Sequence, residues 1–497
     1  MYELNTGPRH QYIGWALVLF ALASAYYNGW LVSLERGVWF DEALTAFFVE
    51  QSWDGLFKLI SEFEANMSFY YISLKLWAGL FPSEIGLRFF SFLAYLGTGA
   101  IFVLAIRRIV GLWTGIVFLA LFLGHFFLIR YGVEVRGYAF AGLFLAGLWY
   151  CLLRAATDGG GRWWVAYALI GLFAVHSHFF VSLGIFGMGI IALLLRTPAF
   201  SIRYWFFSHA AIALSFVPIL LFVVFKESGQ LAWQEPPDLR ALLDTAFMYA
   251  GAAPPAPDWV RRSLLLFFAV LCGVGLLAGT RFYASDFRRM STELTLAKAS
   301  LIAVAALPVI LAFVMSQVEP AFSWRFFIPF VPFFLVLVAL GIGSLGRTRS
   351  LLVFTVLLGL MTTSAVSYSD RSDFSWSAQV GNMFDDCNGA EGVLFMTPNA
   401  QSVFRFYETR SREADSCNWT IYPYQMTPDN YTSSPEIYPE ELTGLRDLEA
   451  LWIYESHLGE DEAGIYQSYM NEIETEFRAC SLVIRNEGLT LLRCVRS

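Results

Sequence analysis

The chain has 497 residues, of which 57% are hydrophobic and 15% are charged, and its formal net charge is −8 at pH 7. Soluble domains carry roughly 25% charged residues, so this composition excludes an ordinary soluble protein, and the acidic balance gives no support for nucleic-acid binding. The apolar residues form repeated runs of about 16 to 20, the length at which a helix crosses a bilayer. We therefore predict a polytopic α-helical membrane protein.

About eleven membrane-spanning helices are predicted within residues 1–368. They start near Ile13, Phe89, Leu112, Tyr138, Trp163, Phe180, Trp205, Leu264, Ala299, Phe326 and Leu351. The run at Ile13 has no small-residue cleavage pattern, which favours a retained helix over a removed signal peptide. The first outer loop, 34–88, has apolar residues at helical spacing among charged ones, which predicts one or two helices lying in the membrane interface.

The basic residues of the short loops predict the orientation, because cytoplasmic loops carry an excess of Lys and Arg. If the N-terminus is cytoplasmic, the basic short loops all fall on the cytoplasmic side: Arg107, Arg108, Arg154, Arg162, Arg196, Arg203, Arg281, Arg288, Arg289, Lys298, Arg347 and Arg349. The pair Arg261 and Arg262 is the exception. An odd number of spans then places the C-terminal domain on the outer side.

Polar residues at a membrane surface are costly and mark candidate functional sites. The predicted topology brings four polar groups to the outer face: Asp41-Glu42, Glu134-Val135-Arg136, His176-Ser177-His178, and Glu319 with Trp324-Arg325. This gathering was not used to set the orientation, so it supports an outward-facing polar site.

Two interpretations of Asp41 and Glu42 stay open. A carboxylate at the membrane surface is suited to act as a general base on an acceptor hydroxyl. Alternatively, both acids are solvated loop residues that begin an interfacial helix, where negative charge suits the helix N-terminus.

The second group lies between the third and fourth predicted spans. Glu134 and Tyr138 are four residues apart and share a helix face, and Arg130 has the same spacing from Glu134, as in a local ion pair. Arg136 would point elsewhere on a continuous helix, so we predict that a helix starts or breaks here. An Arg beside aromatic residues suits a phosphate group, and a purely structural role is the alternative.

The remaining groups are ambiguous from spacing alone. His176 and His178 are two apart and would point to nearly opposite faces of one helix, which disfavours a shared metal unless the helix ends there. They either bind phosphate or metal, or cap the turn. Arg325, after Trp324, is either an interface anchor that snorkels or a phosphate contact.

Residues 369–497 are predicted to form a soluble domain. Short strand-like pieces alternate with helix-like ones: strands at 392–396, 451–454, 482–484 and 489–492, and helices at 375–386 and 462–477. This alternation predicts a small α/β domain.

Four of the six cysteines lie in this tail: Cys387, Cys417, Cys480 and Cys494. An even number in an outer-face domain predicts disulfides. Pairing of sequence neighbours is the local arrangement, two other pairings stay open, and free buried thiols are the alternative. Cys151 and Cys272 fall inside spans and are expected to be packing residues.

The string Trp39-Phe40-Asp41-Glu42-Ala43-Leu44-Thr45 resembles the first outer loop of the GT-C glycosyltransferases, in the bacterial branch related to protein O-mannosyltransferases (glycosyltransferase family 39-like). Further similar strings follow in the family's order: 69–77, 83–88, 130–139, 176–180 and 323–329. Each string is weak alone, whereas the ordered set, over roughly residues 10 to 345, is fairly specific.

The resemblance implies a transferase of a bacterial inner membrane that moves a sugar from a polyprenyl-phosphate donor, mannose-like first, to an acceptor hydroxyl on a glycan, lipid or protein. Asp41 would be the catalytic base, and the leaving phosphate would be stabilised by positive groups. The implied binding residues are Glu42, Glu134, Arg136, Tyr138, His176, His178, Arg325, Tyr70 and Tyr71. Members of the fold differ in metal use, which leaves open a Mg²⁺ or Mn²⁺ site at Asp41, Glu134 and His178.

Two departures bear on the substrate. Relatives often have a Pro pair where this chain has Asn66-Met67-Ser68, and often have Gln or Ala beside the Glu that is flanked here by Val133 and Val135. The tail matches no family. Two other functions stay as alternatives: a transporter or flippase of a lipid-linked sugar, which needs no base, and a membrane anchor that carries the tail as a binding module.

Overall fold

The structure is a computed structural model of the chain. Apart from a few positions before Gly37, it describes residues 37–225, 234–278, 287–369, 376–385, 387, 389–396, 400–410, 418–422, 424–431, 442, 444–456, 463–477, 479–486 and 489–496. The chain divides into two compact units. The helical unit holds the described residues of 1–33, 65–227 and 231–372, and the mixed unit holds those of 34–64, 228–230 and 373–497.

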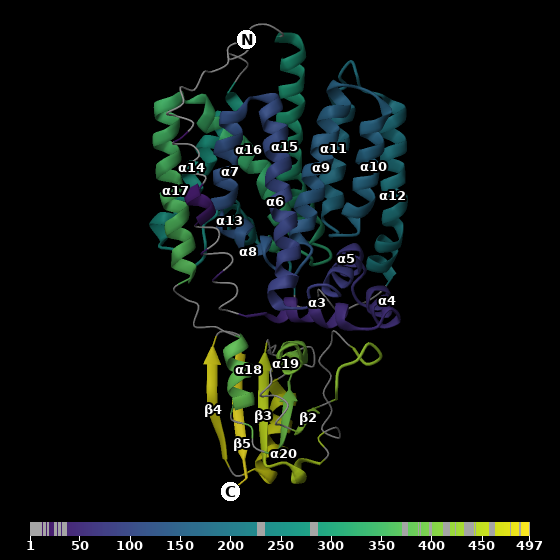
Figure 1. Ribbon diagram of the computed structural model, residues 1–497, viewed down its shortest axis with the longest axis vertical. Helices are drawn as coiled ribbons and strands as arrows, with labels where there is room; N and C mark the ends of the chain where they lie inside the picture. The colour runs from purple at the N-terminus through teal and green to yellow at the C-terminus, as the bar shows by residue number, and fades with distance from the viewer. Residues whose placement is uncertain are drawn as a thin grey trace. The chain divides into compact units, whose positions relative to one another are not determined.

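The helical unit is a bundle of long apolar helices (Figure 1). Its helices are η2 (Ala65–Met67), α5 (Ser68–Ala78), α6 (Glu84–Ile109), α7 (Leu112–Gly124), α8 (Phe126–Gly132), α9 (Tyr138–Thr157), α10 (Gly161–Val175), α11 (Val181–Leu194), α12 (Ile202–Phe225), α13 (Leu239–Tyr249), α14 (Asp258–Leu277), α15 (Phe287–Met315), η3 (Trp324–Phe330), α16 (Val331–Ser344) and α17 (Arg347–Ser369).

The predicted polytopic class is confirmed. Among the described residues, seven helical segments are long and apolar enough to cross a membrane, and α7 with α8 forms an eighth that bends by 68°. The shorter α10 and α11 coincide with the predicted spans near Trp163 and Phe180, and the predicted span near Ile13 falls largely outside the described residues. The count of eleven therefore stays a prediction.

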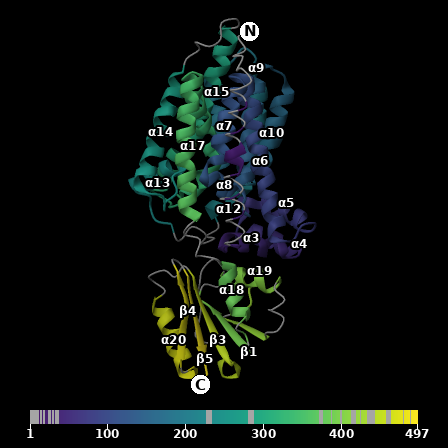
Figure 2. The ribbon, with the colours of Figure 1, turned by 60° about the vertical axis from the view of Figure 1, so that its left-hand side comes forward.

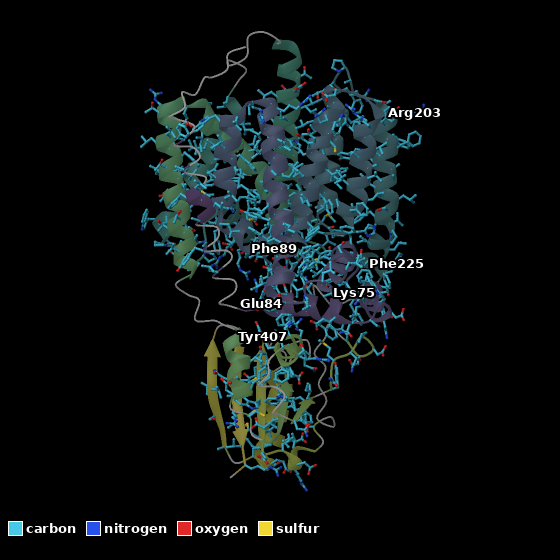
Figure 3. The ribbon with its side chains drawn as sticks, viewed as in Figure 1. Lys75, Glu84, Phe89, Arg203, Phe225 and Tyr407 are labelled. Carbon is cyan, nitrogen blue, oxygen red and sulfur yellow. A yellow bond between two sulfur atoms is a disulfide. The ribbon has the colours of Figure 1, made fainter. Side chains whose placement is uncertain are left out.

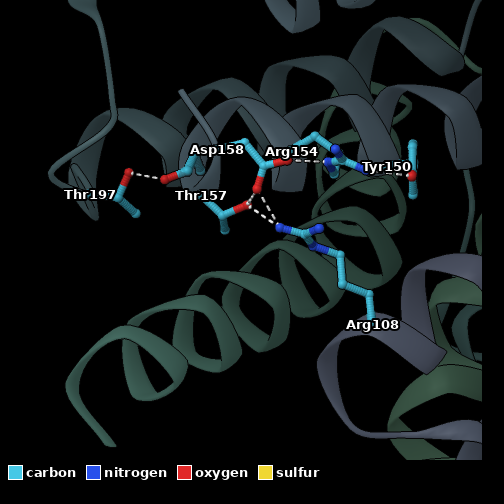
Figure 4. A network of polar contacts seen from close by, with 7 residues as sticks. Arg108, Tyr150, Arg154, Thr157, Asp158 and Thr197 are labelled. Atoms are coloured by element: carbon cyan, nitrogen blue, oxygen red, sulfur yellow. Dashed lines mark hydrogen bonds and ion pairs between the residues drawn. The ribbon is translucent and has the colours of Figure 1, made fainter. Parts of the chain in front are cut away.

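Three of the predicted cytoplasmic loops, those after α6, α9 and α11, lie at one end of the helical unit. Arg108, at the end of α6, and Arg154, near the end of α9, both pair with Asp158 (Figure 4). Thr197, after α11, donates to the carbonyl of Ala156 at 2.6 Å. Figure 3 shows Arg203 at this end and Glu84 at the other. These three loops thus share one end as predicted, and which end faces the cytoplasm stays a prediction.

Glycines allow α14 and α16 to touch backbone to backbone. A Cβ added to Gly275 would lie 2.0 Å from the carbonyl oxygen of Leu337, and one added to Gly341 would lie 2.0 Å from that of Leu271. Small residues at such contacts let membrane helices pack without side chains between them.

The mixed unit combines two helices of the first outer loop, α3 (Phe40–Glu50) and α4 (Trp53–Glu62), with the C-terminal tail. The division of the chain therefore places 34–64 with the tail, whereas the predicted boundary lay at 368/369. The tail contains β1 (Ala390–Phe395), β2 (Asn418–Tyr422), β3 (Ala450–Ser456), β4 (Ala479–Asn486), β5 (Leu489–Val495), α18 (Trp376–Asp385), α19 (Gln401–Glu408), η7 (Leu445–Asp447) and α20 (Ala463–Glu476).

The predicted small α/β fold of the tail is confirmed. Its sheet has the order β2-β1-β3-β5-β4, with β2, β1 and β3 parallel and β5 and β4 antiparallel to their neighbours. Successive strand residues face opposite sides, so Leu394 packs with Tyr469 of α20 and Phe395 contacts Phe404 of α19. The helices thus cover both faces of the sheet (Figure 2).

One predicted disulfide is confirmed, between Cys480 and Cys494 on paired strands. Cys387 is also disulfide-bonded, and its predicted partner, Cys417, lies outside the described residues. Cys151 and Cys272 are free and lie in helices of the bundle, as expected of packing residues.

Candidate functional site

The predicted break between the third and fourth spans is present. Helix α8 ends at Gly132, α9 begins at Tyr138, and between them the Arg136 amide donates to the Glu134 carbonyl at 2.8 Å. A Cβ on Gly137 would lie 2.5 Å from the carbonyl oxygen of Ser177. Only a glycine allows this approach, which presses the 133–137 turn against the loop that carries both histidines.

Two opposite charges are buried at this turn. The Glu134 side chain is fully buried, and one of its carboxylate oxygens lies 3.4 Å from Nη1 of Arg130, one helical turn earlier. The local ion pair predicted from the spacing therefore forms. Because burial makes a charge expensive unless it is compensated, this pair keeps an acid beside the turn that presents Arg136.

Arg136 points toward α5. Its Nη1 donates to the hydroxyl of Tyr71 at 3.2 Å, and Tyr71 is itself fully buried. The Arg136 side chain is half-buried, so the protein fixes its orientation while keeping it partly accessible. A guanidinium with a fixed fork of N–H donors matches the oxygens of a phosphate.

His178 lies beside this Arg in an aromatic setting. Its ring is 5.3 Å from the ring of Tyr138 and 5.8 Å from that of Phe326, and the residue is 3% exposed. Burial, and secondly the charge of Arg136, lower the pKa of His178 to about 3. Its Nδ1 is buried and has no hydrogen-bond partner among the described residues. The imidazole is therefore neutral at pH 7 and suited to a polar ligand group.

His176 has a different environment. Its Nδ1 lies 3.2 Å from Oγ of Ser68 and its Nε2 lies 3.1 Å from the carbonyl oxygen of Ser215, so both ring nitrogens contact the protein. Burial lowers its pKa. The residue joins the loop after α10 to α5 and α12, and its predicted role as a ligand stays a prediction.

Helix η3 brings Arg325 to the same region. The ring of Trp324 is 6.0 Å from that of Tyr131 in α8, and the ring of Phe326 contacts His178. Arg325 stands between Trp324 and Phe326 in the sequence and is half-buried. The structure thus brings three of the four predicted polar groups together, and we name Arg130, Glu134, Arg136, Tyr138, His178 and Arg325, with Tyr71, the polar cluster.

Tyr70 and Tyr71 occupy neighbouring positions on α5 but contact different partners. The Tyr70 hydroxyl lies 3.1 Å from Oγ of Ser91 on α6, and both residues are fully buried. Tyr71 contacts the polar cluster through Arg136, and the ring of Tyr70 lies 6.2 Å from that of Tyr71.

Asp41 and Glu42 lie in the mixed unit, in the first turn of α3. Glu42 is 1% exposed, and its carboxylate accepts a hydrogen bond from the Trp39 amide at 3.4 Å, as part of a capping box. Asp41 is half-buried, and its carbonyl accepts from the Thr45 hydroxyl at 2.9 Å. Glu42 thus caps the first turn of α3, where the second interpretation placed negative charge, but it is buried and not solvated as that interpretation expected. Asp41 is the more accessible acid.

Sequence reasoning missed the role of Asn66. Its Oδ1 accepts from the Phe179 amide at 2.7 Å, and the Phe69 amide donates to the His176 carbonyl at 2.9 Å. These bonds fix the start of α5 to the loop that carries His178. The only signal in the sequence was that Asn66-Met67-Ser68 replaces the Pro pair that is common in relatives.

A three-ligand metal centre is not visible in the part of the chain that the structure describes, where no group of three or more His, Cys, Asp or Glu side chains is suited to hold a metal ion. In the polar cluster, the acid Glu134 is paired with Arg130. The predicted Mg²⁺ or Mn²⁺ site at Asp41, Glu134 and His178 stays a prediction, and no chemical step below depends on a metal.

Comparisons with known proteins agree with this architecture. No family model matches the chain, and no curated protein matches it by sequence. Among solved structures, ArnT from Cupriavidus metallidurans bound to undecaprenyl phosphate superposes with a TM-score of 0.63 at 11% identity, over 97% of this chain and 98% of that chain. Apo ArnT gives 0.60 at 10% identity over the same shares of both chains.

An oligosaccharyltransferase from Archaeoglobus fulgidus in complex with Zn and sulfate gives a TM-score of only 0.43 at 11% identity, over 85% of this chain and 59% of that chain. The two ArnT superpositions show that the chain has the fold of ArnT over nearly the whole length of both chains.

Proposed function

We propose that this protein is an integral-membrane inverting glycosyltransferase. It moves a sugar from a polyprenyl-phosphate donor to an acceptor hydroxyl at the outer face of a bacterial inner membrane. A mannose-like sugar is the first candidate. Two findings support the proposal: the fold of ArnT, a structure of which holds undecaprenyl phosphate, and the polar cluster at one place in the helical bundle.

The observation that carries the proposal is the setting of Arg136. This guanidinium is fixed by the Tyr71 hydroxyl at 3.2 Å, is half-buried, and lies close enough to His178 for its charge to depress the pKa of that imidazole. A preorganised and partly buried positive group is worth most where negative charge develops. A lipid phosphate that leaves the sugar develops such charge.

In the proposed reaction, the acceptor oxygen attacks the anomeric carbon while the bond from that carbon to the phosphate oxygen breaks. The bonding electrons leave with the phosphate, where Arg136 and Arg325 stabilise them and neutral His178 serves as a hydrogen-bonding group. Asp41 takes the acceptor proton as general base. A single displacement inverts the anomeric centre. Glu42, Glu134, Tyr138, His176, Tyr70 and Tyr71 are the further residues that we assign to substrate binding or to its support.

The experiment incubates purified protein with radiolabelled polyprenyl-phosphate mannose, glucose or arabinofuranose and a membrane extract. Wild type is compared with Asp41→Asn and with Asp54→Asn, which makes the same change at an exposed position of the same outer loop. We expect transfer by wild type and Asp54→Asn and a loss of about 10²- to 10⁴-fold in Asp41→Asn.

Each other result points to a different conclusion. Equal transfer by Asp41→Asn removes this residue as the base. Tight donor binding without transfer from any donor contradicts a transferase and favours a transporter of lipid-linked sugars. Metal use is decided in the same assay: if a cation is required, EDTA abolishes transfer and Mg²⁺ or Mn²⁺ restores it.

A further inference from the structure

The first outer loop and the C-terminal tail form one compact unit, although more than 300 residues separate them in the sequence. The Val38 amide donates to the hydroxyl of Tyr407 at 2.6 Å across a separation of 369 residues. Tyr407, labelled in Figure 3, lies on α19 of the tail. The chain reaches this bond through Gly37, whose φ of 71° is in the left-handed region that glycine adopts freely.

This bond lies immediately before the proposed base. Val38 is 1% exposed, and two residues later α3 begins at Phe40, with Asp41 in its first turn. The Glu42 carboxylate caps the same turn through the Trp39 amide. Tyr407 and Glu42 thus fix consecutive amides of the segment that leads to Asp41.

Aromatic contacts fix the remainder of α3 to the tail. Tyr431 contacts Phe48 with a ring distance of 5.5 Å and Phe63 with 4.7 Å. Arg405 of α19 lies over the ring of Phe47 at 6.0 Å. All residues of α3 from Glu42 to Val49 are buried, and α3 belongs with the tail to the mixed unit.

Ion pairs add polar contacts at the rim of the same interface. Arg410 pairs with Glu50 at the end of α3, and Lys58 of α4 pairs with Asp429 at 2.7 Å. The Asp429 side chain is 86% exposed, and surface pairs of this kind contribute little to stability. The bond to Tyr407 is the polar contact of the tail nearest in sequence to Asp41 among those described here.

We propose that the tail positions Asp41, the proposed general base of the transferase. Tyr407 is a positioning residue that holds the backbone before Asp41. The inference rests on the proposed function and gives the C-terminal domain a catalytic purpose. Transfer rates are sensitive to displacements of a reacting group of about 1 Å, so a domain that fixes α3 at its start and along its length controls the rate without contacting the substrate.

The test compares wild type, Tyr407→Phe and Asp429→Asn in the full-length protein. Tyr407→Phe keeps the ring and removes only the hydroxyl, whereas Asp429→Asn removes an exposed contact between the same two segments. We expect Tyr407→Phe to lower kcat by about three- to tenfold with the KM for the donor unchanged, after normalisation to the fraction of protein that binds radiolabelled polyprenyl phosphate. Asp429→Asn should behave as wild type.

Hydrogen exchange gives a readout that does not depend on transfer activity. In Tyr407→Phe, the amide of Val38 should exchange about tenfold faster, as expected for loss of one buried hydrogen bond, while peptides of the β1 and β3 strands stay protected. If exchange at Val38 accelerates and kcat stays unchanged, the positioning role is wrong even though the contact exists. If no donor supports transfer by wild type, the proposed function fails and the exchange result still reports on the contact.

Discussion

Buried polar and charged groups have different hydrogen-bonding surroundings in the two units. In the mixed unit, Glu391 is 1% exposed and is held by short bonds, 2.6 Å from Nε1 of Trp452 and 2.9 Å from Arg493. In the polar cluster of the helical unit, the contact between Arg130 and Glu134 is longer, at 3.4 Å, and Nδ1 of His178 has no hydrogen-bond partner among the described residues.

This difference separates charges that serve the fold from groups that are suited to a ligand. A buried acid with short bonds on both carboxylate oxygens specifies the packing of a sheet and has little capacity for a substrate. A neutral imidazole beside a partly accessible guanidinium has that capacity. The predictions below test this distinction, beginning with a change that removes the helical unit itself.

Substitution of Gly275 by Leu should have the largest effect. Even a Cβ at this position would lie 2.0 Å from the Leu337 carbonyl oxygen, so α14 and α16 cannot keep their contact. We expect loss of the folded helical unit, as measured by size-exclusion chromatography and thermal unfolding in detergent. Gly273→Ala on the same helix, where a Cβ would meet nothing within 4 Å, is the control. A monodisperse Gly275→Leu protein with wild-type Tm would contradict the close packing.

Arg136→Lys tests whether the polar cluster binds phosphate through the shape of its donor as well as its charge. Lysine keeps the charge but loses the planar fork and the bond to Tyr71. We expect kcat/KM for the polyprenyl-phosphate donor to fall about 10- to 100-fold, the range for loss of one hydrogen bond to a charged group. Arg196→Lys, in a loop at the opposite end of the bundle, should leave the rate unchanged. A wild-type rate in Arg136→Lys would refute a bidentate phosphate contact.

Much of the helical unit was predictable because its signals are local. Apolar runs of bilayer length mark the spans. The helix break at Arg136 was predicted because, on a continuous helix, this residue would point away from the face shared by Glu134 and Tyr138. The gathering of Glu134, His178 and Arg325 followed from the topology alone, because alternate loops lie on the same side of the membrane. The pairing of Gly275 with Gly341 was not predictable, because it depends on which two helices touch.

The mixed unit was predictable only in its tail. Alternating strands and helices gave the α/β class, although β2 and α19, which are only 5 and 8 residues long, were missed. The joining of 34–64 to the tail could not be foreseen, because no local pattern links Val38 to Tyr407 across 369 residues. The same reason hid Asn66, whose importance depends on an amide in a distant loop.

Glu391→Gln should destabilise the mixed unit without changing the rate of sugar transfer per folded molecule. The change removes the charge that Arg493 pairs with inside the sheet, and loss of one partner of a buried pair costs about 3 kcal/mol. We expect faster hydrogen exchange in the β1 and β3 strands, with transfer per folded molecule unchanged. Glu474→Gln on an exposed position of α20 is the matched control. Wild-type protection of both strands in Glu391→Gln would show that the pair does not stabilise the sheet.

The smallest effect concerns the acid side of the stability profile. Burial lowers the pKa of His178 from 6.5 to about 3, so the unfolded chain binds a proton more readily than the folded one between these values. The stability that neutral His178 contributes is therefore complete above pH 6.5 and declines, by at most about 1.4 kcal/mol per pH unit, as the pH falls toward 3. His178→Gln cannot take up that proton, so its Tm should fall less steeply than that of wild type between pH 7 and about 5. Parallel slopes in the two proteins would mean that the imidazole is already solvated in the folded state, and His178 would then not be a buried group that lacks the short bonds of Glu391.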